Sequence, residues 1–160
     1  MKIEFTSIGI IHTPFKEPDD MPIQPAGARG VKGTVMVFEE FQPGLQDLDG
    51  FSHIILLYCF HRSRGYKLQV VPFMDSKQHG IFATRAPKRP NPLGLSIVRL
   101  DRVVKGVLNV RNVDMLDNTP LLDIKPYVPQ FDVQTDVVRT GWLEKITKTA
   151  AQQKADDRFL

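Results

Sequence analysis

The 160-residue sequence predicts a mainly β protein: a small β-barrel, closed or partly open, with a short helix at its C-terminal end. Valine, isoleucine and phenylalanine recur in short runs separated by glycine, proline, asparagine and aspartate, the pattern of strands joined by turns. Helical periodicity is nearly absent before Trp142. Many short strands of this kind are typical of barrels.

Nine segments are expected to form strands, and one pair of them is expected to form a hairpin. The segments are 3–11, 33–38, 53–60, 68–71, 80–84, 95–104, 107–113, 121–127 and 137–142. Within the sixth, Val98, Leu100 and Val104 are expected to share one face. The Lys105-Gly106 pair is a plausible two-residue turn into the next strand.

The organisation along the chain predicts one barrel domain over residues 1–142, followed by a short helix and tail over 143–160. The segment 54–60 is apolar on both faces, so it is expected in the middle of the sheet or under a partner subunit. Trp142, Ile146 and Ala150 are spaced as on one face of an amphipathic helix. Trp142 is expected to be a core or interface anchor.

Composition narrows the class of protein. A 42% hydrophobic chain of this length can bury one core, and its longest apolar run, 54–60, is far shorter than the about 20 residues of a membrane span. We see no signal peptide and expect a cytoplasmic protein. Cys59 is the single cysteine, so an internal disulfide or a multi-cysteine zinc site is excluded. We expect a reduced, buried thiol and no metal.

Charge is uneven along the chain. Residues 61–105 carry a net charge of +8, while the rest of the chain sums to −5. Such a block is either a binding surface for the phosphates of a nucleic acid or a solvated loop face. Charge alone does not choose between them.

Several common activities lack their motifs. No glycine-rich turn with a following acidic residue, no Walker A loop, no His-Glu-x-x-His and no Gly-x-Ser-x-Gly is present. Dinucleotide binding of the doubly wound type, nucleotide hydrolysis, zinc proteolysis and serine esterase chemistry are therefore not indicated. Composition alone leaves the function open.

Four segments carry a resemblance to a known family. Residues 85–96, Arg-Ala-Pro-Lys-Arg-Pro-Asn-Pro-Leu-Gly-Leu-Ser, closely resemble the signature of the TrmO (TsaA-like, YaeB-like) family of tRNA methyltransferases. Segments 8–15, 50–53 and 116–127 agree with the same family in the same order. The resemblance covers roughly residues 5–142.

The resemblance implies a small β-barrel distinct from the Rossmann-type methyltransferases, which fits the missing glycine-rich turn. It also implies a homodimer with S-adenosyl-L-methionine bound near the subunit contact. The implied reaction is methylation of N6 of threonylcarbamoyladenosine at position 37 of tRNA, so tRNA is the implied partner.

Cofactor-binding residues are implied only where motifs match. They are Pro22, Ile23, Gln24, His61, Arg62, Arg85, Leu95, Met115, Leu116, Asp117 and Asn118. Two positions depart from the family pattern, because Ala86 replaces a serine and Asn118 replaces a glycine. Asparagine tolerates the left-handed conformation better than most residues, so the turn at Asn118 is expected to survive. Loss of a hydroxyl at Ala86 removes one possible hydrogen bond.

The signature segment is expected to be a stiff loop, because its three prolines each fix a backbone angle. Such a loop can preorganise Arg85, Lys88 and Arg89 for a carboxylate or a phosphate. Lys88, Arg89 and Asn91 are the candidate substrate-binding residues. The alternative is an exposed charged turn.

The chemistry is an in-line displacement, for which alignment is the main task. An acceptor for the N6 proton would help, and the catalytic candidates are Asp117, Asp123, His53 and Tyr127. None is preferred. Asp123 would need a partner such as Lys125, His53 is equally explained as a core histidine, and Tyr127 either stacks on a base or packs. His12 is expected to serve the turn beside Pro14.

Two other functions remain open at this level. One is a non-catalytic RNA-binding accessory barrel, which would bind tRNA without responding to the cofactor. The other is hydrolase chemistry that uses His53 or His61 with an aspartate, for which no nucleophile motif is present.

Overall fold

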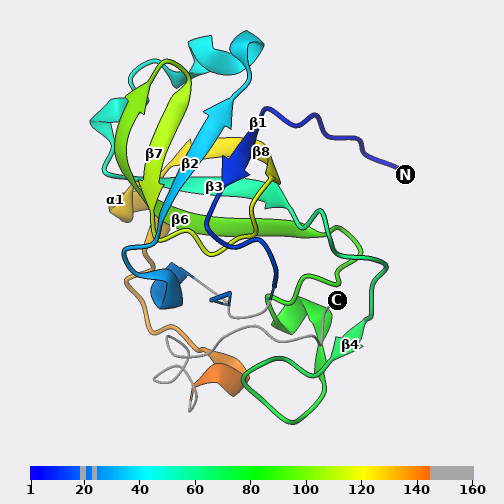
Figure 1. The fold of residues 1–160 in the computed structure, drawn as a ribbon. Helices are drawn as coiled ribbons and strands as arrows, with labels where there is room; N and C mark the ends of the chain where they lie inside the picture. The colour runs from blue at the N-terminus through cyan, green and yellow to red at the C-terminus, as the bar shows by residue number, and fades with distance from the viewer. Residues whose placement is uncertain (19–20, 23–24, 145–160) are drawn as a thin grey trace.

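Six antiparallel strands close into a barrel (Figure 1). The structure, a computed structural model, describes residues 1–18, 21–22 and 25–144. Around the barrel the order is β1 (Gly9–His12), β2 (Lys32–Val37), β7 (Val107–Arg111), β6 (Leu93–Val104), β3 (His53–Cys59) and β8 (Thr119–Pro126). The predicted mainly β barrel is therefore confirmed, in its closed form.

Helical elements among the described residues are short. They are η1 (Pro25–Ala28), η2 (Glu39–Leu45), η3 (Leu48–Gly50), η4 (Ile81–Ala83), α1 (Pro129–Asp132) and η5 (Gly141–Leu143). None of them has the length and hydropathy of a membrane span.

The barrel core comes from strict alternation along the strands. In β3, Ile54, Leu56 and Tyr58 point inward and are buried, while the residues between them are half-buried on the outer face. β3 lies between β6 and β8, as expected for a strand in the middle of the sheet. Cys59 falls on the outer face of this alternation, so the expected buried thiol is corrected to a half-buried free one.

The hairpin of β6 and β7 is confirmed, with one correction. Lys105 and Gly106 both have positive φ, at 47° and 77°, which is the geometry of a type I′ turn. A register shift between Leu100 and Arg102 inserts an extra residue and reverses the alternation beyond it. Val103 therefore packs against the core, and Val104, predicted to face inward with Leu100, is 47% exposed.

A second, smaller layer lies between β3 and β6 in sequence. It contains the two-stranded sheet of β4 (Gln69–Val70) and β5 (His79–Gly80), and Figure 1 shows it below the barrel. The predicted strand over 80–84 is corrected, because the chain turns into η4 after Gly80. Val70, Ile81 and Ala86 form its own small apolar cluster.

Two other predicted strands are corrected at the ends of the chain. The strand expected over 3–11 begins only at Gly9 and runs on to His12, and residues 137–142 form no strand, with Val137 97% exposed. Pairing of β1 with β8 closes the barrel and leaves no free edge to which further strands can add.

Trp142 anchors the chain where the described residues end. Its indole Nε1 donates a hydrogen bond to the carbonyl of Ala83 at 2.9 Å, and its ring stacks on His79 at 4.4 Å between centroids. The expectation of a core anchor is corrected, because Trp142 is half-buried and packs on the smaller layer outside both apolar clusters of the described residues. The predicted helix over 143–160, with Ile146 and Ala150, lies almost wholly outside the described residues.

Gly94 is a position where packing against Tyr58 requires glycine. A Cβ at Gly94 would lie 2.2 Å from the Tyr58 ring. We predict that Gly94→Ala lowers the free energy of unfolding by about 1–3 kcal/mol through overpacking. Gly44→Ala is the control, since a Cβ there meets nothing within 4 Å. Equal stability of the two variants in urea denaturation would contradict this packing.

Candidate functional site

Four loops meet at one end of the barrel. They follow β1 (13–17) and β3 (60–67), precede β6 (84–92), and join β7 to β8 (112–118). Backbone hydrogen bonds connect them, from Asp117 N to Phe15 O at 2.7 Å and from Phe60 N to Pro92 O at 2.8 Å. Segments far apart in sequence thereby share one site.

Asp117 is the centre of this site. Its Oδ1 accepts hydrogen bonds from the Thr13 backbone N–H at 3.0 Å and from His12 Nδ1 at 3.3 Å. Its Oδ2 accepts from Lys16 Nζ at 2.5 Å and from Asn118 Nδ2 at 3.0 Å. Although removal from water opposes ionisation, the hydrogen bonds from Lys16 and Thr13 and the charge of Lys16 lower the pKa of Asp117 to about 2. His12 therefore belongs to the carboxylate cluster rather than to a turn beside Pro14.

A carboxylate with this pKa is a poor proton acceptor at neutral pH, because general bases work best near the ambient pH. Asp117 is also held by four donors, which fixes its oxygens in place. The environment of Asp117 suits a fixed negative charge that orients a ligand.

The loop before β8 is tied to the loop after β3. The Thr119 hydroxyl donates to the carbonyl of Leu116 at 2.7 Å and lies 3.4 Å from His61 Nδ1. Burial and the neighbouring Arg62 lower the pKa of His61. Asn118 has φ of 59°, which confirms that asparagine takes the left-handed conformation expected of this turn.

Arg62 connects the same region to the loop after β1. Its Nη1 donates to the carbonyl of Lys16 at 3.0 Å, and its Nη2 lies 2.8 Å from Glu17 Oε2. The predicted cofactor residues His61, Arg62 and Met115 to Asn118 are therefore brought together. Sequence spacing alone does not place them side by side.

A buried polar chain inside the barrel was not anticipated from the sequence. Ser96 Oγ donates to Asp114 Oδ1 at 2.6 Å, and the Tyr58 hydroxyl, 3.0 Å away, donates to Ser96 Oγ. Burial raises the pKa of Asp114 to about 6, against the hydrogen bond from Ser96 and the positive charge of Arg85. The sequence held one sign of this buried polar chain, because Ser96 is a polar residue on the same strand face as the apolar Val98.

The signature loop is held by one of its own arginines. Arg89 Nη1 donates to the carbonyls of Thr84 at 2.8 Å, Ile81 at 3.1 Å and Ala86 at 3.4 Å. This nitrogen therefore organises the loop. Ala86 itself is buried in the apolar cluster of the smaller layer, and the Thr84 hydroxyl accepts a hydrogen bond from its backbone N–H at 3.3 Å. A side-chain hydroxyl at position 86 would face this apolar cluster.

Other predicted cofactor residues lie apart. Leu95 is 53% exposed on the outer face of β6, opposite Leu57 of β3. Pro22 is buried, while Ile23 and Gln24 lie outside the described residues.

The remaining base candidates are separated from Asp117. His53 begins β3 and Cys59 ends it, so His53 lies at the far end of that strand from the loop that follows it. The His53 and Tyr127 rings meet edge to face at 6.3 Å. Asp123 pairs with Lys125 at 2.8 Å, the partner expected for it.

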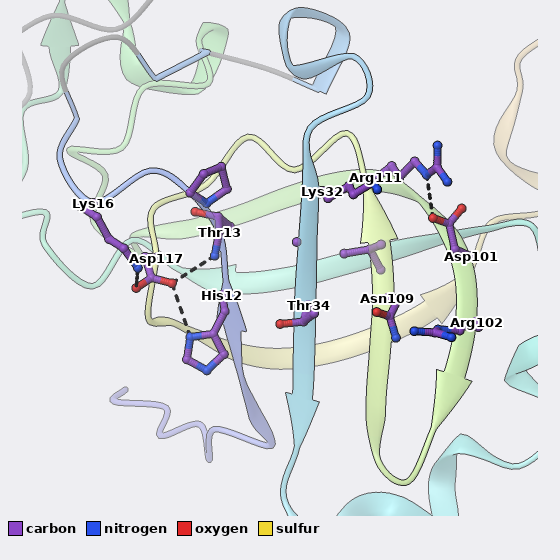
Figure 2. Close-up of a pocket in the computed structure, with 13 residues that line it drawn as sticks. His12, Thr13, Lys16, Lys32, Thr34, Asp101, Arg102, Asn109, Arg111 and Asp117 are labelled. Atoms are coloured by element: carbon purple, nitrogen blue, oxygen red, sulfur yellow. Dashed lines mark hydrogen bonds and ion pairs between the residues drawn. The ribbon is translucent and has the colours of Figure 1, made fainter.

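An open groove of about 860 Å³ begins at this site and crosses the outer face of the barrel (Figure 2). His12, Lys16 and Asp117 lie at one end, and Arg102 and Arg111 at the other. The arrangement at the loop end combines a fixed carboxylate, a histidine and exposed cations, which can orient a charged, polar ligand.

Comparison with known proteins identifies the family. Residues 10–133 match the family described as the tRNA-methyltransferase O N-terminal domain. The chain belongs to the TrmO family. A crystal structure of TrmO from Pseudomonas aeruginosa superimposes with a TM-score of 0.74 at 38% identity, covering 89% of this chain and 63% of that one.

Relatives of this TrmO-family chain carry related names. A protein of Pyrococcus abyssi, 55% identical over 99% of this chain and 86% of its own length, is named a probable S-adenosyl-L-methionine-binding protein. The tRNA (adenine(37)-N6)-methyltransferase of Escherichia coli is 35% identical over 79% of this chain and 58% of its own length. The chain thus spans less than two thirds of the Escherichia coli enzyme and of the solved TrmO chain.

We predict that Asp114→Asn changes the pH dependence of stability. Because the folded protein holds the Asp114 proton more tightly than the unfolded chain, this stabilisation is complete below pH about 4 and is lost as pH rises through about 6. Relative to the variant, the free energy of unfolding of the wild type should fall by up to about 3 kcal/mol over that interval. Urea denaturation at a series of pH values measures it. Parallel curves for the two proteins would contradict the buried, neutral form of Asp114.

Proposed function

We propose that this protein uses S-adenosyl-L-methionine to methylate N6 of threonylcarbamoyladenosine at position 37 of tRNA. The observation that carries the proposal is the convergence of His61, Arg62 and the 115–118 loop around the ionised Asp117, in a chain of the TrmO family. The names of the Escherichia coli and Pyrococcus abyssi relatives support the reaction and the cofactor. Because the proposed substrate is tRNA, the proposal includes a cytoplasmic location.

The residues at the barrel end fit the charges of this cofactor. Arg85 is exposed and can pair with a carboxylate, while Asp117 offers a fixed anion to an ammonium or to ribose hydroxyls. Pro22, Ile23 and Gln24 are proposed to contribute the remaining contacts. The cofactor supplies an electrophilic methyl group, and the task of the protein is to align the acceptor nitrogen with it.

Lys88, Arg89 and Asn91 remain the proposed substrate contacts of the signature loop. Because Arg89 Nη1 holds three loop carbonyls, its contribution includes keeping the loop in shape. Asp117, Asp123, His53 and Tyr127 remain the candidate proton acceptors, with Asp117 the weakest by its low pKa.

The cofactor assignment predicts a thermal shift. S-adenosyl-L-homocysteine, present far above its Kd, should raise the melting temperature of the wild type, because a ligand bound only by the folded state stabilises it. Arg85→Ala should lose most of this shift. Arg64→Ala, which removes another exposed arginine, is the matched control and should retain it. A wild type that shows no shift would refute the cofactor assignment.

The proposed homodimer predicts a symmetric contact through the outer face of β6. Leu93, Leu95 and Ile97 are 38%, 53% and 38% exposed there, a continuous apolar row beside the half-buried outer face of β3. In such a dimer Leu95 would lie at the subunit contact, where the cofactor is proposed to bind.

Light scattering at micromolar concentration should give twice the chain mass for the wild type. Ile97→Glu should give the monomer mass, because a charge in a buried apolar contact lacks a partner. Val137→Glu, at a position 97% exposed, should stay dimeric. A monomeric wild type refutes the dimer.

A further inference from the structure

The groove on the outer barrel face is built from two parallel rows of polar side chains. Strand register places Thr34, Asn109 and Arg102 opposite one another across β2, β7 and β6, with His12 of β1 at the end of the row. Figure 2 shows these four side chains along the groove.

The second row is cationic. Lys32 of β2 lies opposite Arg111 of β7, which lies opposite Arg99 of β6. Like charges directly opposite on neighbouring strands destabilise a sheet. Asp101, two residues after Arg99 on the same face of β6, pairs with both arginines, with Oδ2 at 2.6 Å from Arg111 Nε and Oδ1 at 3.3 Å from Arg99 Nε.

The net charge of this surface is positive. Lys16, Lys32, Arg102 and Arg111 line the groove against Asp101 and Asp117, both of which are already held by cations. Four cations against two carboxylates leave the groove lining net positive. A row of three opposed cations beside a row of hydrogen-bonding side chains matches a polyanion that also carries hydroxyls.

The size and position of the groove favour a nucleic acid chain over a single nucleotide as its ligand. Four strands at about 4.8 Å spacing make the groove about 14 Å wide from β1 to β6. One end is the His12–Asp117 cluster of the proposed cofactor site. A polymer whose reacting base lies at that cluster would run its backbone across the two rows.

We propose that this groove binds the sugar-phosphate backbone of tRNA next to the nucleotide that is methylated. Lys32, Arg102 and Arg111 of the groove lining contact phosphates, with Arg99 beside the groove, and Thr34 and Asn109 hydrogen-bond to the backbone. This inference rests on the proposed function, and it locates the RNA on a strand surface distinct from the signature loop.

The test compares two double variants that remove the same charge. Lys32→Ala/Arg102→Ala removes two exposed cations of the groove, and Lys2→Ala/Arg139→Ala removes two exposed cations elsewhere. Filter binding of a tRNA transcript is measured across a salt series, together with cofactor binding by calorimetry and thermal melting. Lys32→Arg/Arg102→Lys keeps the charge and serves as the rescue variant.

The groove variant should bind tRNA about tenfold or more weakly near 0.1 M salt, with the slope of log affinity against log salt reduced by roughly 1–2, as two phosphate contacts are lost. Cofactor affinity should be unchanged. The control and the charge-keeping variant should both resemble the wild type, which separates loss of charge from loss of folding.

Other outcomes overturn the inference in distinguishable ways. If the wild type binds tRNA and the groove variant keeps the same affinity and slope, the groove is not the RNA surface while the proposed function stands. Weaker binding with an unchanged slope would mean that the contacts are not to phosphates. A wild type that binds the cofactor but no tRNA would refute the proposed substrate itself.

Discussion

Closure of the barrel by pairing of β1 with β8 is the constraint on which the rest of the structure depends. Residues 9–11 lie opposite residues 119–121, more than a hundred positions away in sequence. This pairing places the end of β1 beside the start of β8, so His12, the last residue of β1, meets the loop that carries Asp117. It also removes the sheet edges, so residues 3–7 and 137–142 find no open edge of the barrel on which to form a strand.

Two aspartates three residues apart show how strongly the fold sets chemistry. Asp114 points into the barrel, where burial raises its pKa to about 6. Asp117 lies among Lys16, the Thr13 N–H and His12, and its pKa falls to about 2. The same side chain is thus a buried group able to hold a proton in one position and a fixed anion in the other.

The register shift in β6 links stability to the proposed RNA surface. Because one residue is inserted, Asp101 and Arg102 both lie on the outer face, Arg102 comes to lie opposite Asn109, and Val103 turns toward the core. A regular strand would also have kept Asp101 on the outer face, but it would have turned Arg102 inward and Val103 outward. β-Bulges commonly change the direction in which the side chains of a strand point, and this bulge lies at the rim of the groove.

The sequence by itself determined the mainly β class, the hairpin turn at Lys105-Gly106, the left-handed Asn118 and, through the 85–96 signature, the family. These are local properties, since they follow from side-chain alternation, backbone preferences and contiguous motifs. The predictions of an inward-facing Val104 and of a strand over 137–142 were wrong. Neither a β-bulge nor the absence of a free sheet edge can be read from the local residue pattern.

Only the tertiary structure decided which polar residues meet. The hydrogen-bonded chain from Tyr58 through Ser96 to Asp114 joins residues from β3, β6 and the loop before β8, and no spacing rule predicts it. Likewise, Lys32 and Arg111 become neighbours only through strand register. The pKa of a carboxylate and the charge of a surface depend on which residues are close in space. Closure of the barrel determines which residues these are.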